Sequence, residues 1–266
     1  RAALLLVELV ERVGSSHDEV LGVGIGLPAP VDTATGTISV PGIMRGWDDV
    51  AVTHVMEKRL GYPVFVDNDA NLGALAESQL GASRIYRDSV YVRVSYGVGG
   101  GIVIAGRVHQ GFAGTAGEIG HVLVDPAGDI CQCGSRGCLN TVVGVQALLA
   151  SLHASRGNLT LQDLVTLAKD GDPGCRQVVE DAGAIIGGTV AGLAVGVNPQ
   201  CVVVGGELAE TGEILIGPMR EVIRRRVLLN HVAPLEVGGA ELSSRAEVMG
   251  AIMLVLEHTD LPSTIV

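Results

Sequence analysis

Aromatic residues are scarce in this sequence, which contains two Phe, one Trp and four Tyr among 266 residues. Hydrophobic residues nevertheless make up 47% of the chain, and 38 positions are glycine. A core with so few large rings must be built from small aliphatic side chains and from backbones that glycine allows to approach closely. This composition is typical of an α/β protein, and the length is sufficient for one large domain or two lobes.

Basic residues are also fewer than acidic residues. The chain has 18 Lys and Arg against 29 Asp and Glu, which gives a formal net charge of −11. Nucleic-acid binding depends on a basic face that releases counterions from the phosphates. This stretch is therefore not expected to bind DNA by itself, and any DNA contact would require residues outside it.

Long hydrophobic runs are absent, since the longest, residues 182–197, is closed by Asn198 and Pro199. A membrane-spanning helix needs about 20 apolar residues, so we expect a buried helix here and no membrane partner. The sequence also lacks solenoid repeats, low-complexity tracts and linker-like stretches.

The cysteine content does not fit a secreted disulfide scaffold, because five is an odd number and no signal peptide is recognisable. We therefore expect a reducing, cytoplasmic location. The chain begins with Arg1 rather than Met and enters an amphipathic helical pattern without a capping residue. We expect the sequence to be a fragment that another segment precedes.

Three cysteines cluster near one histidine in the segment HVLVDPAGDICQCGSRGC, which contains His121, Cys131, Cys133 and Cys138. Zinc favours four tetrahedral nitrogen and sulfur ligands, and the intervening glycines allow the tight turn that brings three sulfurs together. These four residues predict a structural zinc site, which would order the segment only when the metal is bound. The alternative is that the cysteines are buried thiols or disulfide partners.

Hydrophobic periodicity predicts strands separated by helices, which favours α/β sheets that bind ligands beyond the strand ends. A β-hairpin with an unusually open turn, SYGVGGG, is expected over residues 90–104. The predicted strands are 21–26, 64–66, 90–94, 102–104 and 201–204. The predicted helices are 1–14, 70–81, 145–155, 161–169, 178–197, one ending at 226, and 246–258.

Four segments together resemble the ROK family of bacterial sugar kinases and sugar-responsive repressors. They are VGIGLPAPVD (23–32), VDNDANLGALAE (66–77), VSYGVGGGIV (94–103) and GEIGHVLVDPAGDICQCGSRGCLN (117–140). The resemblance extends from Val23 to the last helix, and the histidine and cysteine spacing is its most specific part.

The resemblance implies an actin-like ATPase fold with two ribonuclease-H-like lobes that close over a sugar. We expect an N-terminal lobe of residues 1–84 that lacks its first strands. A C-terminal lobe of residues 85–245 would carry the zinc-binding segment 121–138. The last helix, 246–260, would pack back on the N-terminal lobe.

The resemblance also implies roles for individual residues. Asp69 matches the general base of the kinases, although from the sequence alone it could simply cap the helix that follows. Asn68, Glu118 and His121 match positions that bind sugar hydroxyls. Glycines that match phosphate-binding or nucleotide-binding positions are Gly97, Gly99, Gly100, Gly101, Gly205 and Gly206; they could equally serve tight turns.

Three departures from the kinase pattern bear on function. The chain contains no Asp-x-Gly-Gly-Thr phosphate loop. Ser95, Tyr96 and Gly97 stand where kinases usually have Gly-Thr-Gly, and the bulk of Tyr96 opposes close approach of a phosphate. Asn140 stands where the family usually has a glutamate that binds sugar, so we expect sugar recognition through an amide there.

These features favour the sugar-sensing and dimerisation domain of a ROK transcriptional regulator, with its DNA-binding winged helix-turn-helix upstream. A homodimer or tetramer is expected. The alternative is an ATP-dependent and magnesium-dependent hexose kinase with Asp69 as its base. A third possibility is a zinc-stabilised binding module without a ligand.

Overall fold

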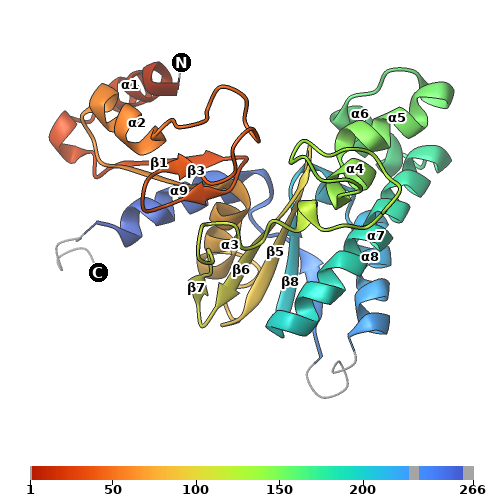
Figure 1. Ribbon diagram of the computed structural model, residues 1–266. Helices are drawn as coiled ribbons and strands as arrows, with labels where there is room; N and C mark the ends of the chain where they lie inside the picture. The colour runs from red at the N-terminus through yellow and green to blue at the C-terminus, as the bar shows by residue number, and fades with distance from the viewer. Residues whose placement is uncertain (1, 228–233, 260–266) are drawn as a thin grey trace.

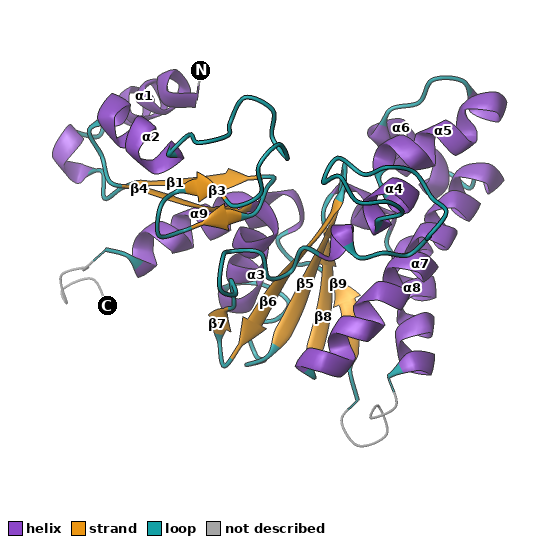
Figure 2. Ribbon diagram, in the orientation of Figure 1, coloured by secondary structure: helices purple, strands orange, loops and turns teal. Residues whose placement is uncertain are grey.

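The computed structural model describes residues 2–227 and 234–259, which form two lobes (Figure 1). One lobe holds a parallel strand pair and two helices, and the other holds a five-stranded sheet backed by helices (Figure 2). Elements of the first lobe are α1 (Ala2–Val13), η1 (His17–Glu19), β1 (Val23–Leu27), β2 (Val31–Asp32), β3 (Thr37–Ile38), α2 (Val52–Leu60) and β4 (Val64–Asn68).

In the N-terminal lobe, β1 and β4 run parallel, with Val23 opposite Val64 and Leu27 opposite Asn68. Their buried valines and leucines share a core with Leu6 of α1 and Met56 of α2. The predicted opening helix and both strands are present, and β4 continues beyond the predicted strand to Asn68. This extension places the DND sequence at the carboxyl end of the strand.

The C-terminal lobe contains a mixed sheet with the order β7-β6-β5-β8-β9. The central strand β5 (Ser89–Val94) is antiparallel to β6 (Val98–Ile104) and parallel to β8 (Cys201–Gly205). The edge strands are β7 (Arg107–Val108), antiparallel to β6, and β9 (Glu236–Gly239), parallel to β8.

Side chains of β5 alternate between the two faces of this sheet, as the period of a strand requires. Val90, Val92 and Val94 belong to the large core beneath the helices, whereas Tyr91 faces the cluster that contains Ala74 and Ala246. The helices of the first face are α4 (Leu139–Val143), α5 (Val145–Arg156), α6 (Leu161–Lys169), α7 (Pro173–Val197) and α8 (Glu213–Arg226).

Two helices connect the lobes. α3 (Asp69–Gln79) packs on β5 and β6 and also contacts β1 and β4, while α9 (Ala246–Glu257) packs on α3, β1 and β4 (Figure 1). The short helices are η2 (Ile119–His121), η3 (Glu207–Thr211) and η5 (Ser243–Arg245). The lobe boundary between residues 84 and 85 stays a prediction, and residue 260 of the expected last helix lies outside the described residues.

α7 is long and apolar enough, by length and composition alone, to cross a membrane. Within the fold, however, it packs against α4, α5, α6 and α8, and Val179, Ile186 and Val190 are fully buried. α7 begins before the predicted residue 178, because Asp172 caps it through the Cys175 N–H and Pro173 occupies the first turn.

The expected open turn between β5 and β6 is wrong. Val94 pairs with Val98, so only Ser95, Tyr96 and Gly97 form the turn. Gly99, Gly100 and Gly101 lie inside β6 instead. A Cβ on Gly99 would meet the Ala70 side chain at 3.2 Å. A Cβ on Gly101 would meet the Ala70 carbonyl oxygen at 2.5 Å. Gly99 and Gly101 therefore allow α3 to lie close to the sheet, whereas Gly100 lies against Gly117 and Ile119.

Candidate functional site

Asn68 ends β4 and caps α3. Its Oδ1 accepts hydrogen bonds from the N–H groups of Ala70 at 2.9 Å and Asn71 at 3.2 Å, and its Nδ2 donates to the Ala29 carbonyl at 3.1 Å. The interpretation of Asp69 as the cap is therefore wrong, because Asp69 is the first residue of the helix. Within residues 2–227 and 234–259, Nδ2 donates only to Ala29, so its second N–H can donate to a ligand.

Asp67, which the sequence reasoning missed, anchors the site. It is buried and accepts hydrogen bonds from the Asn68 N–H at 2.7 Å, Asn71 Nδ2 at 2.9 Å and Gln110 Nε2 at 2.6 Å. Burial raises the pKa of Asp67, and the three donors oppose that shift. Because Gln110 belongs to the loop before η2, this carboxylate joins β4 to the segment that carries Glu118 and His121.

Asp69 presents a partly buried carboxylate at the N-terminus of α3, with 20% of its side chain exposed. Its Oδ2 lies 3.5 Å from the Arg93 guanidinium. Burial raises the pKa of Asp69, and the positive charge of Arg93 lowers it. The carboxylate can accept a hydrogen bond from a ligand hydroxyl, and when ionised it can take a proton from that hydroxyl.

Glu118 and His121 stand at the two ends of η2, with Glu118 Oε2 3.7 Å from His121 Nε2. Burial raises the pKa of Glu118 to about 7, and the charge of Asp69 acts in the same direction. Burial lowers the pKa of His121, which favours the neutral imidazole. The structure thus brings Asp69 and Glu118 into one electrostatic environment beside His121.

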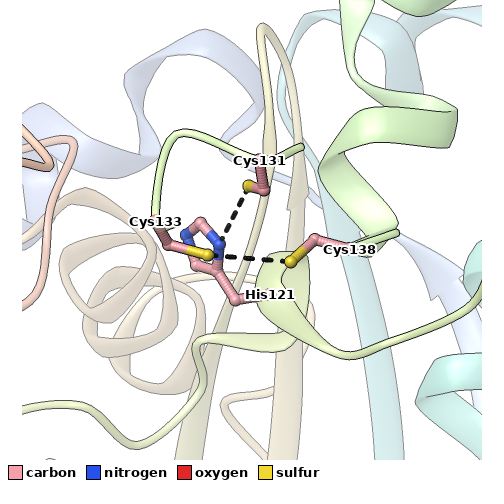
Figure 3. Close-up of side chains that lie close together, drawn as sticks. All are labelled: His121, Cys131, Cys133 and Cys138. Atoms are coloured by element: carbon pink, nitrogen blue, oxygen red, sulfur yellow. Dashed lines mark hydrogen bonds between the residues drawn. The ribbon is translucent and has the colours of Figure 1, made fainter. Parts of the chain in front are cut away.

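His121, Cys131, Cys133 and Cys138 converge, with all four ligand atoms within 4.8 Å of one another (Figure 3). The contacts are 3.5 Å from Cys131 Sγ to His121 Nδ1 and 3.7 Å between the sulfurs of Cys133 and Cys138. With Zn–S of about 2.3 Å and Zn–N of about 2.0 Å, a tetrahedral ion separates two sulfurs by about 3.8 Å and sulfur from nitrogen by about 3.5 Å. The cluster therefore fits a Cys₃His metal site.

The turn between the cysteines explains this convergence. Gly134 and Gly137 both adopt positive φ, and Cys131 closes the turn through hydrogen bonds with Ser135 and Gly134. Because Nδ1 of His121 points toward the thiols and Nε2 toward Glu118, one imidazole links the metal cluster to the candidate sugar site.

Asn140 lies in the first turn of α4 and accepts a hydrogen bond from the Val98 N–H at 2.7 Å. This contact holds the start of β6 against α4. The Asn140 side-chain oxygen therefore has a backbone partner, while its amide nitrogen lies beside Gly120.

The expected phosphate-binding glycines lie beside and beyond the carboxyl-terminal half of β5. The Gly100 N–H donates to the Gly117 carbonyl at 2.8 Å, so this amide already has a partner. Gly205 and Gly206 lie against Tyr91 and the backbone of Val94, where a Cβ would collide. Gly206 also has a φ of 87°, which favours glycine.

Arg93 is the second residue that the sequence reasoning missed. It stands in β5 directly opposite Gly99 of β6 and Gly205 of β8, so glycine flanks it on both sides. Its side chain reaches Asp69, Glu207 and Glu247. The available signal is a charged residue within the otherwise β-rich run SVYVRV.

Known proteins resemble this chain over almost its whole length. The profile of the ROK family matches residues 3–258. The xylose repressor of Caldicellulosiruptor bescii is 30% identical over 95% of this chain and 66% of its own length. The chain thus spans about two thirds of that repressor.

Two solved structures have the same fold. A ROK family glucokinase from Streptomyces griseus, solved with glucose and AMPPNP, is 28% identical with a TM-score of 0.85 over 96% of this chain and 87% of its own. A ROK family transcriptional regulator, a homologue of the E. coli MLC protein, is 29% identical with a TM-score of 0.83 over 96% and 67%. The α/β fold is therefore that of the actin-like ATPases, and the chain belongs to the ROK family.

Proposed function

We propose that this chain is the sugar-sensing and dimerisation domain of a ROK-family transcriptional regulator whose DNA-binding winged helix-turn-helix lies upstream. The similarity to a xylose repressor and to a solved ROK regulator supports this assignment. The net charge of −11 agrees with a domain that leaves DNA contacts to another segment.

The observation that carries the proposal is the closed turn between β5 and β6. Tyr96 occupies its tip with 74% of its surface exposed, and the turn contains only three residues. The Gly100 N–H donates to Gly117 rather than facing an open loop. A phosphate cradle needs several free backbone N–H groups that point at one anion, so this turn is poorly suited to ATP.

The sugar would lie among Asp69, Glu118 and His121, with the amides of Asn68 and Asn140 at the margins. The bound metal would be zinc with a structural role, since four protein ligands leave no position for a substrate. By orienting His121 it would fix one hydrogen-bonding group of the sugar site. The cytoplasm is the proposed location, because free thiols persist there.

The second candidate is an ATP-dependent hexose kinase, and the position of Asp69 favours it. A partly exposed carboxylate at a helix N-terminus, next to a sugar site, is what a general base requires. In that case ATP and magnesium would be required, although Gly99 and Gly101 face α3, and Gly205 and Gly206 lie against Tyr91 and Val94.

The two functions are separated by measuring sugar binding and ADP release on the same preparation. For a regulator we expect calorimetric binding of at least one sugar, no ADP release with ATP and magnesium, and a change in DNA affinity of the full-length protein. Sugar-dependent ADP release that disappears in Asp69→Asn would overturn the regulator proposal. If DNA affinity is the same with and without every sugar that binds, the chain does not act as a sugar sensor and that part of the proposal is wrong.

A further inference from the structure

Arg93 is surrounded by carboxylates from three different elements. Its Nε donates to Glu247 of α9 at 2.6 Å, one terminal nitrogen lies 3.5 Å from Asp69 of α3, and the other lies 4.0 Å from Glu207 of η3. These partners are separated along the chain, so the cluster exists only in the folded protein. Each of the first two partners has about a fifth of its side chain exposed, which limits screening by solvent.

The sheet gives Arg93 the room to occupy this place. Gly99 and Gly205 flank it on the same face of the sheet, and neither has a side chain to shield the guanidinium. Tyr91, two residues earlier, points to the same face and packs beneath Gly205 and Gly73. The guanidinium is therefore directed toward Asp69 and the start of α9.

The charges of the cluster do not cancel. One guanidinium faces three carboxylates, so the ionised cluster carries an excess of two negative charges. Glu207 contributes a buried Oε2 that accepts no hydrogen bond from residues 2–227 or 234–259. Charges at such short range interact more strongly in a partly buried site than in water. An anionic ligand group beside Asp69 would be repelled, whereas a hydroxyl that donates to it would be stabilised.

We propose that Arg93, held by Glu247 and Glu207, positions Asp69 as an ionised acceptor for an uncharged sugar hydroxyl, and that the surplus of carboxylates excludes phosphorylated ligands. This inference rests on the proposed sugar-binding function and specifies its ligand class. Arg93 is a positioning residue, since it acts on the ligand through Asp69. The positive charge of the guanidinium compensates the clustered carboxylates, as a bound metal cation often does.

The electrostatics of Asp69 explain why such a partner is needed. Burial favours the protonated acid, and the negative charges of Glu247 and Glu207 act in the same direction. The carboxyl group of Glu118, at the start of η2, is a further acidic group in the electrostatic environment of Asp69. Arg93 provides the opposing positive charge. Without Arg93, Asp69 would keep its proton to higher pH and lose part of its capacity to accept a hydrogen bond from a sugar hydroxyl.

The first experiment is the pH profile of sugar affinity by calorimetry, with the sugar that the wild type binds most tightly. In Arg93→Met we expect sugar affinity about tenfold lower near pH 7. The acid limb of the profile, which is the pH range in which affinity falls as Asp69 is protonated, should lie at higher pH than in wild type. In Glu247→Gln the acid limb should move to lower pH, because a negative charge beside Asp69 has been removed. Arg93→Lys should recover much of the wild-type profile.

A purely structural role for Arg93 predicts a different result, since loss of packing would lower affinity at every pH without moving the limb. Arg84→Met serves as the matched control, because Arg84 pairs with Glu241 on the exposed surface. Wild-type profiles in both Arg93→Met and Glu247→Gln would overturn the inference. If Arg93→Met does not fold, the shift of the pH profile to lower pH in Glu247→Gln still tests whether charges beside Asp69 control sugar affinity.

The second experiment compares the same sugar with its monophosphate esters. We expect every ester to bind the wild type at least about tenfold more weakly, with part of the loss recovered in Glu207→Gln and Glu247→Gln. An ester that binds more tightly than the free sugar would overturn the exclusion of phosphate. If the wild type binds no sugar at all, the proposed function fails, whereas an unmoved pH profile removes only the role of Arg93.

Discussion

At the scale of single residues, the carboxylates of Asp67, Glu77 and Asp69 have different roles, which depend on their hydrogen-bond and charge partners. Asp67 accepts three hydrogen bonds and joins two segments. Glu77 is fully buried and accepts from the backbone N–H groups of Ala82 and Leu242, which fixes the chain before α9. Asp69 instead faces a guanidinium and keeps part of its surface exposed. Among these three, Asp69 is therefore the carboxylate best placed to bind a ligand.

Asp69 should reduce the stability of the protein at neutral pH. Its pKa in the folded state is raised above the unfolded value, chiefly by burial. Stability from such a group is present below the unfolded pKa of about 3.9 and is lost as pH rises through the folded pKa. We expect Asp69→Asn to melt at a higher temperature than wild type at pH 7, with the difference shrinking toward pH 4.

The measurement is thermal unfolding of both proteins between pH 4 and 8. Asp163→Asn is a suitable control, because Asp163 has a lowered pKa from its hydrogen bonds with Thr160 in the capping box and should lose stability at neutral pH. A melting temperature of Asp69→Asn below wild type at pH 7 would mean that the Arg93 ion pair outweighs burial.

At the scale of elements, the sequence was informative where local chemistry determines structure. Helix 161–169 has the bounds that hydrophobic periodicity predicts, and the structure shows a capping box of Thr160 and Asp163 at its start. The four residues of the Cys₃His cluster lie within one short segment, so their spacing is sufficient to predict that they come together. The Arg93 cluster could not be predicted in this way, because Arg93 and Glu247 are 154 residues apart.

The glycines of β6 illustrate the opposite case. Three consecutive glycines favour an open turn by their local conformational freedom. In the fold, Gly99 and Gly101 allow close packing of α3 and Gly100 lies against Gly117, and only the tertiary structure contains these requirements. Gly101→Ala should therefore lower the free energy of unfolding by about 1–3 kcal/mol and displace the N-terminus of α3 with Asp69.

The matched variant is Gly192→Ala in α7. Among the described residues, no heavy atom outside the neighbouring backbone of this helix lies within 4 Å of the added Cβ. It should raise stability by about 0.5–1 kcal/mol. Urea denaturation and sugar affinity measure both effects, and affinity should fall only in Gly101→Ala. Equal stability of the two variants would show that the close approach of β6 and α3 is not a constraint.

The zinc segment should depend on its metal. Wild-type protein is expected to contain about one zinc per chain, because the cluster offers four ligands to one ion. Cys133→Ser should lose the metal, expose the segment 121–138 to protease, and weaken sugar binding through misorientation of His121. Metal analysis, limited proteolysis and calorimetry measure these three consequences.

Cys175→Ala provides the matched control, since Cys175 is buried in α7 and lies outside the cluster. It should keep one zinc per chain and resist protease as wild type does. Full zinc content in Cys133→Ser would exclude the four-ligand site, and unchanged sugar affinity after metal removal would separate the metal from ligand binding.

At the scale of the whole molecule, α3 and α9 form the connection between the lobes. Leu72 and Leu75 of α3 pack with Leu254 of α9, and Gly250 lies directly against the Leu72 backbone. α9 also covers β1 and β4 of the N-terminal lobe (Figure 2). Its first turn carries Glu247, which binds Arg93 of the C-terminal sheet. A change at the Asp69–Arg93 pair can therefore reach the N-terminal lobe through α9.

This connection predicts that a bound sugar changes the angle between the lobes. A sugar that contacts Asp69 from one side and Glu118 and His121 from the other binds a closed arrangement more tightly, and so shifts the population toward it. We expect the radius of gyration from small-angle X-ray scattering to fall on saturation with the sugar and to stay unchanged with a sugar alcohol that does not bind. In a regulator, such closure would alter the distance between paired DNA-binding segments, which must match the spacing of their half-sites. An unchanged radius at saturating sugar would require a signal that acts without lobe closure, through the order of the zinc segment alone.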